Sequence, residues 1–262
     1  MRNVVVLLLV IVSLTQLSAQ NTKDTLRVLF IGNSYTFYHN VPYLVSEISN
    51  QTDTKIIAKK STAGGASLSD HWRGERKLKT VDILKNGNFD IVVLHDQSMR
   101  PIEEPDSFFY YSKLFSDLIK ESGAKPYFFG TWAREKVPQW QQVLTENYKK
   151  AASGNNAEIV QVGEAWALAK KYRPAVELYA SDGSHASSLG ALLTALVFVN
   201  ALTGQVPEKL SNKIYIKSAD GESILIMNES KLDVDFCLEI AKELNNNMLV
   251  DDKLNKGKTI KL

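Results

Sequence analysis

Residues 26–36 read LRVLFIGNSYT, and they are the most informative segment of the chain for its fold class. The run Leu26–Ile31 is almost continuously apolar, which is typical of a strand that is covered on both faces. It ends abruptly at Gly32, and the polar residues Asn33 and Ser34 follow. The stretch predicts a buried strand that leaves the core through a tight polar turn and presents Ser34 at its carboxyl end.

Short runs of the same kind recur along the chain and alternate with amphipathic segments. The helical segments place their apolar residues on one face, as in 108–119 and 140–151. This alternation predicts a parallel sheet with helices on both sides, and so a three-layer α/β/α fold. The predicted strands are residues 26–31, 54–59, 90–95, 126–131 and 159–162.

The rest of the chain is predicted to continue the same domain. Residues 189–204 are apolar nearly all round, which predicts a buried helix that ends at a glycine. Residues 213–218 and 224–227 flank a polar turn and predict a small hairpin. A helix follows, and its apolar face includes Cys237, which we interpret as a core residue. We find no domain-sized linker, so residues 20–262 are predicted to form one domain.

The first 19 residues resemble a secretory signal peptide. The cation Arg2 precedes an apolar core, Val4–Val12, and small residues follow up to Ala19. A membrane anchor is the alternative, but the apolar core is too short to span a bilayer. We therefore expect cleavage after Ala19, export to the periplasm or the medium, and no stable insertion in the membrane.

The composition argues against several classes of partner. Lys and Arg number 31 against 29 Asp and Glu, a net charge of +2, which offers no electrostatic footprint for nucleic acid or anionic membrane. The one cysteine excludes an intramolecular disulfide, which suits a bacterial periplasm at least as well as an animal extracellular space. No Cys/His cluster has zinc spacing, and residues 64–67, GGAS, lack the ending of a phosphate loop. We expect no nucleic-acid partner, no metal and no organic cofactor.

Polar residues follow the predicted strands, at the edge where ligands bind in open parallel sheets. Ser34 follows the first strand, and a nucleophilic serine needs an adjacent base that a third group orients. Of the four histidines, only His185 has an aspartate, Asp182, three residues before it. The same loop also fits a helix N-terminus with Asp or Ser as cap, and the two interpretations are compatible. We predict Ser34 as nucleophile, His185 as base and Asp182 as the orienting carboxylate.

An acyl-transfer site also needs hydrogen-bond donors for the developing oxyanion. The backbone N–H groups of Ser34 and Gly65 are candidates, because glycine permits close approach and unusual backbone angles. The side-chain amide of Gln97, which follows the third strand, could supply a third donor. The alternatives are an ordinary loop turn at Gly64 and Gly65 and a solvated amide at Gln97.

In their order and spacing, these blocks resemble the SGNH (GDSL-type) hydrolase superfamily. Residues 32–36, GNSYT, match its first block in the form seen in exported bacterial members, residues 65–67 resemble the second, and residues 182–185 match the last. The third block departs from the pattern. Residues 95–98 are HDQS where many relatives have Gly-x-Asn-Asp, so Gln97 would replace the usual asparagine.

The resemblance covers about residues 26–202 and leaves 203–262 as a C-terminal extension. It implies a flavodoxin-like sheet of five parallel strands. It also implies transfer of an acyl group to Ser34 and its hydrolysis by water, with His185 as general base and then general acid. The oxyanion hole that it implies consists of Ser34, Gly65 and Gln97.

Aromatic, polar and cationic side chains near this edge of the sheet would suit a sugar ring. The loop after Gln97 is charged and rich in proline, unlike the apolar lid of a lipase. Exported relatives of this kind resemble carbohydrate O-acetylesterases, so we expect an exported esterase that removes acetyl or other short acyl groups from a glycan. The expected partner is a glycan ester or a small-molecule ester substrate. The alternatives are a lysophospholipase or thioesterase with a longer acyl pocket, and a glycan-binding pseudoenzyme. The candidate substrate-binding residues are Tyr35, His71, Trp72, Arg100, Trp132 and Arg134, although Trp72 and Trp132 could simply pack loops onto the sheet.

Overall fold

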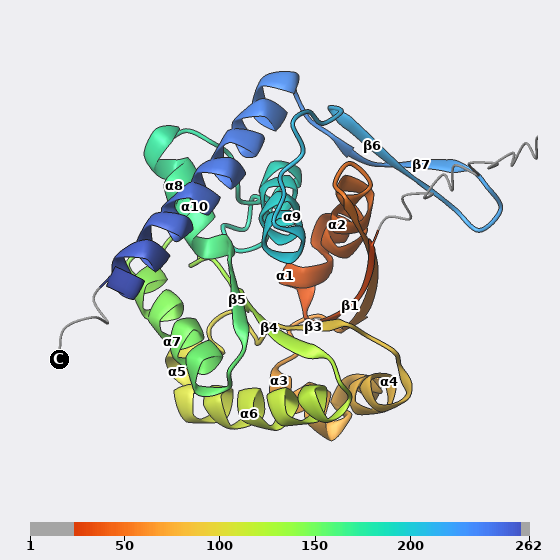
Figure 1. Ribbon diagram of the computed structural model, residues 1–262, viewed down its shortest axis with the longest axis vertical. Coiled ribbons are helices and arrows are strands. Elements are labelled where there is room, and N and C mark those ends of the chain that lie inside the picture. The colour runs from red at the N-terminus through yellow and green to blue at the C-terminus, as the bar shows by residue number, and fades with distance from the viewer. Residues whose placement is uncertain (1–23, 258–262) are drawn as a thin grey trace, which may run out of the picture.

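The computed structural model describes residues 24–257, with side chains up to residue 244, so the predicted signal peptide lies outside the described residues. Five parallel strands form one sheet in the order β2-β1-β3-β4-β5 (Figure 1). This is the flavodoxin-like order, and it confirms the predicted fold class. The strands are β1 (Asp24–Gly32), β2 (Thr54–Thr62), β3 (Ile91–Leu94), β4 (Lys125–Gly130) and β5 (Glu158–Gln161).

Helices cover both faces of the sheet, as Figure 1 shows. Helices α2, α8, α9 and α10 pack on one face, and α3, α4, α6 and α7 pack on the other. The helices and 3-10 turns are α1 (Ser34–Phe37), η1 (Tyr38–Asn40), α2 (Val41–Ser49), α3 (Leu68–Arg73), η2 (Glu75–Lys77), α4 (Thr80–Asn86), α5 (Arg100–Glu103), α6 (Pro105–Glu121), α7 (Trp140–Gly154), α8 (Val162–Tyr172), α9 (Ser188–Thr203) and α10 (Lys231–Gly257).

The apolar run in β1 follows from its central place between two helical layers. Val28 and Phe30 belong to the core on one face of the sheet, and Leu29 and Ile31 belong to the core on the other. Because successive side chains of a strand point to opposite faces, a strand covered on both sides must be apolar at every position. Strand β2 is longer than its apolar run predicts, since it pairs with β1 from Asp24 to Gly32 through backbone groups.

Helix α9 is buried almost throughout, as its apolar sequence predicts. Ser187 caps its N-terminus by accepting a hydrogen bond from the backbone N–H of Gly190, and Gly204 ends it with φ of 72°. Serine, and not Asp182, therefore caps this helix. Asp182 remains available for another role.

The C-terminal residues add a hairpin and a long helix to this core. Strands β6 (Lys213–Lys217) and β7 (Ser223–Asn228) form an antiparallel pair that projects away from the sheet in Figure 1. Helix α10 packs on α9, where the Asn200 side-chain amide donates to the carbonyl of Ala241. Cys237 is buried there as predicted, and burial raises the pKa of its thiol. Within residues 24–257, no helix has the length and apolar character that crossing a bilayer requires.

Candidate active site

Asn33 ties together the loops that follow three neighbouring strands. Its backbone is extended, and its side-chain oxygen accepts a hydrogen bond from the N–H of Tyr35, which starts helix α1 directly after β1. Its side-chain amide donates to the carbonyls of Ala66, after β2, and Asp96, after β3, both at 3.0 Å. The buried Asn33 side chain thus fixes the turn that presents Ser34 against the two neighbouring loops.

Ser34, His185 and Asp182 form a continuous chain of hydrogen bonds. The Ser34 Oγ lies 2.8 Å from Nε2 of His185, and Nδ1 of His185 lies 2.5 Å from Oδ2 of Asp182. The other oxygen of Asp182 accepts from the backbone N–H groups of Ser184 and His185. The hydrogen bond from His185, followed by that from the Ser184 N–H, lowers the pKa of Asp182 to about 2.

This arrangement sets the tautomer of the imidazole. The Asp182 carboxylate is ionised at neutral pH and can only accept, so Nδ1 of the neutral His185 carries the proton. Nε2 is then free to accept the hydroxyl proton of Ser34. The geometry is that of a serine nucleophile, a base and an orienting carboxylate.

A cavity of about 240 Å³ opens beside Ser34. Gly65 borders it with φ of 66°, and a Cβ at this position would meet no atom within 4 Å, so the backbone there is open to a ligand. Most of the lining side chains are polar. The lining residues are Asn33, Ser34, Tyr35, Gly65, Gln97, Ser98, Arg134, Ser184 and His185.

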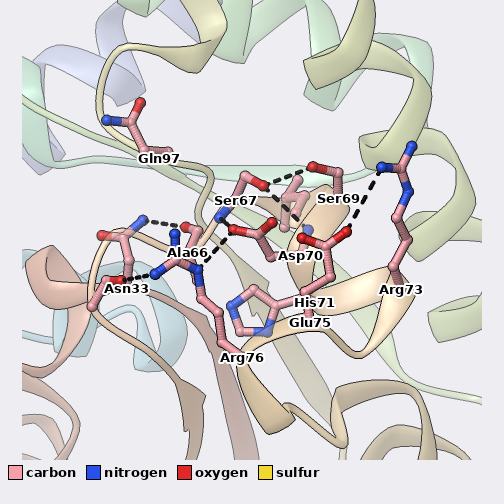
Figure 2. A network of polar contacts seen from close by, with 12 residues as sticks. Asn33, Ala66, Ser67, Ser69, Asp70, His71, Arg73, Glu75, Arg76 and Gln97 are labelled. Atoms are coloured by element: carbon pink, nitrogen blue, oxygen red, sulfur yellow. Dashed lines mark hydrogen bonds and ion pairs between the residues drawn. The ribbon is translucent and has the colours of Figure 1, made fainter.

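Gln97 lines the cavity with one end of its side chain fixed. Its Oε1 accepts hydrogen bonds from the backbone N–H groups of Met99 and Arg100, at 2.8 and 3.1 Å. Figure 2 shows the side chain directed away from the polar network around Asn33. The NH₂ group makes no hydrogen bond within the part of the chain that the structure describes. The predicted oxyanion donors, Ser34, Gly65 and Gln97, thus border one cavity.

The loop that contains Gly65 is braced from outside the cavity. Ser67 caps α3 in a capping box with Asp70, and the Asp70 carboxylate also accepts from Nε of Arg76 (Figure 2). Arg76 in turn donates to the carbonyl of Gly64 at 3.0 Å. Partial burial tends to raise the pKa of Asp70, but the hydrogen bonds from the Ser67 N–H and from Arg76 hold this pKa below its ordinary value. This brace keeps the glycine loop in place beside Ser34.

The structure corrects the expectation that Trp132 contacts substrate. Its indole is 1% exposed and lies parallel between Tyr35 and Trp166, with ring centroids 4.6 and 4.0 Å away. Its N–H donates to the carbonyl of Ser184 at 2.9 Å. Tyr35 is also buried, although it borders the cavity, and its hydroxyl bonds to Oγ of Ser184. Both rings therefore support the loop that holds His185.

His71, Trp72 and Arg100 also lie away from the cavity beside Ser34, which corrects their predicted role. His71 is fully buried under the Ser34 turn, with Nε2 2.9 Å from the carbonyl of Gly32. Trp72 packs edge-on against Phe115 of α6. Arg100 forms an ion pair with Glu104 on its own helix segment. His71 is buried and Arg100 is paired, and none of the three residues borders the cavity beside Ser34.

Tyr38 contacts the catalytic histidine, although no sequence motif indicates it as a site residue. Its ring stacks on the imidazole of His185, with 4.4 Å between centroids, and it is 41% exposed. The only signal in the sequence is its place in the aromatic run that follows Ser34, a run equally consistent with core packing.

The three-layer α/β/α fold positions a Ser34–His185–Asp182 arrangement at its edge, and this arrangement is characteristic of serine hydrolases. Neither a family model nor a curated protein matches the chain. Solved structures do match, and they include SGNH and GDSL-type hydrolases and esterases.

One neighbour is a candidate SGNH hydrolase from Slackia heliotrinireducens, with 26% identity, a TM-score of 0.57, and coverage of 68% of this chain and 100% of that one. A DUF4886 family protein from Bacteroides uniformis has 19% identity and a TM-score of 0.64, over 87% of this chain and 96% of that one. An acetyl xylan esterase has 16% identity and a TM-score of 0.53, over 67% and 99%. The first of these, at 26% identity, supports membership of this chain in the SGNH hydrolase superfamily, as its motifs predict, and the other two support the fold.

Proposed function

We propose that the protein is an exported serine esterase that removes acetyl or other short acyl groups from a carbohydrate. The observation that carries the proposal is the hydrogen-bonded chain Ser34–His185–Asp182 at the edge of a small cavity. An acetyl group fits such a cavity. A long alkyl chain would extend beyond this small cavity into water, where its outer part gains no free energy of burial.

In the proposed mechanism, Oγ of Ser34 attacks the ester carbonyl while Nε2 of His185 accepts the hydroxyl proton. The negative charge of the tetrahedral intermediate is stabilised by the backbone N–H groups of Ser34 and Gly65 and by the NH₂ of Gln97. His185 then protonates the departing sugar hydroxyl. A water molecule, deprotonated by His185, hydrolyses the acetyl-Ser34 ester and releases acetate. Asp182 keeps the imidazole oriented throughout.

The export part of the proposal rests on residues 1–19 alone. Cleavage after Ala19 would release the enzyme into the periplasm or the medium, where acetylated glycans are accessible. Mass spectrometry of the N-terminus of the secreted or periplasmic protein tests this directly, and an intact Arg2 in the mature protein would contradict it.

The central experiment measures acetate release from a panel of acetylated glycans by the wild type, Ser34→Ala and the control Ser153→Ala. Ser153 lies at the end of α7, and its hydroxyl bonds only to the carbonyl of Lys150. We expect Ser34→Ala to lose several orders of magnitude in kcat, as nucleophile removal does in other serine hydrolases, and Ser153→Ala to retain activity. Equal, slow rates for the wild type and Ser34→Ala would indicate a glycan-binding protein without turnover.

The acyl preference is tested with p-nitrophenyl esters of increasing chain length. A maximum at acetate supports the proposal. A maximum at octanoate or beyond would contradict it and favour a lysophospholipase or thioesterase.

A further inference from the structure

We propose that Arg134 binds an anionic group of the substrate, so that the preferred substrates are acyl esters of acidic sugars. This inference rests on the proposed esterase function and names its substrate class. Arg134 follows β4 and lines the same small cavity as Ser34 and His185. The ester and the anionic group would therefore be carried by the same sugar unit.

The Arg134 side chain has unused hydrogen-bonding capacity. Within the described side chains it makes one hydrogen bond, from Nη2 to Oγ of Ser98 at 2.9 Å, and it forms no ion pair. Its Nε is buried without a partner. A guanidinium carries five N–H donors, and leaving a buried donor unpaired costs free energy. Such a group in a cavity wall requires an explanation, and a ligand that accepts these hydrogen bonds provides one.

The other described arginines are satisfied without a ligand. Arg27 is exposed to water at the start of β1. The remaining ones pair with a carboxylate, and these are Arg73 with Glu75, Arg76 with Asp70, Arg100 with Glu104 and Arg173 with Asp233. Arg134 is thus the half-buried arginine without a counter-ion, and it lies beside the nucleophile.

The charge around the cavity favours an anion. None of the lining residues is acidic, since the Asp182 carboxylate lies behind His185 and is bonded to it, and Arg134 carries the permanent positive charge of the wall. A cavity lined by one sign of charge attracts ligands of the opposite sign. The planar fork of an arginine matches the two oxygens of a carboxylate better than a lysine does. The geometry points to a sugar carboxylate, as in a uronic acid.

The test compares two substrates that differ only in this charge, an O-acetylated methyl glucuronide and the methyl glucoside acetylated at the same position. For the wild type we expect kcat/KM to favour the glucuronide about tenfold or more, the effect of one charge-assisted contact. Arg134→Gln should bring this ratio close to one, and Arg134→Lys should give an intermediate ratio. The control Arg100→Gln removes a cation that is paired outside the cavity and should keep the wild-type ratio.

Two outcomes would overturn the inference while leaving the esterase function standing. One is Ser34-dependent hydrolysis of both substrates with no preference for the acid. The other is a loss of equal size on both substrates in Arg134→Gln, which would assign Arg134 to the oxyanion or to folding. If neither ester is hydrolysed, the proposed esterase function is wrong. The role of Arg134 is then tested separately, by measuring how tightly the protein binds the acidic and the neutral sugar.

The binding measurement uses calorimetric titration of Ser34→Ala and of Ser34→Ala/Arg134→Gln with glucuronate and with glucose. Tighter binding of glucuronate that disappears in the double variant supports the role of Arg134. Equal binding of the two sugars, or no binding of either, would contradict it. Thermal unfolding of each variant identifies any loss of the folded state.

Discussion

Tyr38 lies against the imidazole of His185, with 4.4 Å between the ring centroids and 22° between the planes. Tyr35 meets the same imidazole edge-on at 5.5 Å, so aromatic rings and the Asp182 carboxylate together restrict its rotation. The two residues that follow Tyr38 have left-handed backbone angles, with φ of 48° and 55°. Left-handed backbone angles are strained in residues other than glycine. Such strain persists where the surrounding structure requires it, often at functional sites.

We predict that Tyr38→Ala lowers kcat about threefold to tenfold, because a stacked aromatic pair contributes roughly 0.5–1.5 kcal/mol beyond its buried area. Tyr38→Phe keeps the ring and should retain most of the activity. Steady-state kinetics on p-nitrophenyl acetate measures both. A loss in Tyr38→Phe as large as in Tyr38→Ala would show that the hydroxyl, and not the stacking, matters.

His71 supports the Ser34 turn from beneath. Because the Gly32 carbonyl can only accept, Nε2 of His71 carries the proton, and Nδ1 accepts from the hydroxyl of Thr80 at 2.7 Å. Burial lowers the pKa of His71, which favours this neutral form. The Thr80 hydroxyl in turn contacts the hydroxyl of Ser61, which extends the buried chain to β2.

We predict that His71→Phe costs on the order of 1–3 kcal/mol in unfolding free energy, since it leaves the buried Gly32 carbonyl without its donor. It should also lower kcat, because that carbonyl lies at the base of the Ser34 turn. Thr80→Val removes the other hydrogen bond of His71 and should cost stability with a much smaller loss in kcat. Urea unfolding and single-temperature kinetics separate the two effects. Equal losses of kcat in both variants would mean that His71 acts through stability alone.

Gly32 has a steric and not a conformational reason to be glycine. A Cβ there would lie 2.3 Å from Oγ1 of Thr36 and 3.1 Å from Cβ of His95. Thr36 cannot easily withdraw, because its hydroxyl contacts Nδ1 of the buried His95. Gly32→Ala should therefore cost about 1–3 kcal/mol, the usual effect of overpacking.

Thr36→Ala removes the closest atom, so the double variant Gly32→Ala/Thr36→Ala should recover part of that loss. A double-mutant cycle by thermal unfolding measures the coupling between the two sites. Strict additivity of the two substitutions would contradict the steric explanation.

Asp96 should make stability depend on pH in a recognisable way. Burial raises the pKa of Asp96 from 3.8 to about 6, even though the N–H groups of Leu68 and Gln97 bond to its carboxylate. The folded state therefore favours the protonated carboxyl of Asp96. The resulting contribution to the free energy of unfolding is complete below about pH 4 and is lost as the pH rises through about 6. Asn does not titrate, so the stability of the wild type relative to Asp96→Asn should fall by on the order of 3 kcal/mol between pH 4 and pH 7. Urea unfolding of both proteins at several pH values in this range measures the change. The same dependence of unfolding free energy on pH in the wild type and in Asp96→Asn would contradict the prediction.

Much of the fold follows from local patterns in the sequence. The run Val28–Ile31 before Gly32 is apolar at every position, which indicates a strand covered on both sides. The loops after the strands must then meet at one edge, which is why Ser34 and Gln97 could be placed together from the sequence. The pairing of Asp182 with His185 was also accessible, because the two residues lie only three positions apart on one tight loop.

The sequence could not tell which aromatic and basic residues near that edge face the cavity. Trp132 and His71 lie in segments close to the cavity, yet their side chains are buried and form hydrogen bonds to backbone carbonyls beneath it. Tyr38 has an equally ambiguous pattern and faces His185. Side-chain direction in a loop has no periodicity from which it could be predicted, unlike that in a strand or helix.

The parallel α/β/α fold could therefore be read from the chain alone, because hydrophobic periodicity and strand–helix alternation are local properties. The sequence also determined the residue types from which the site is built. The 2.8 Å contact of His185 with Ser34, 151 positions apart in the chain, and the lack of a counter-ion at Arg134 follow from the three-dimensional packing. Such contacts depend on packing between distant segments, and no local pattern encodes which side chains those segments bring together.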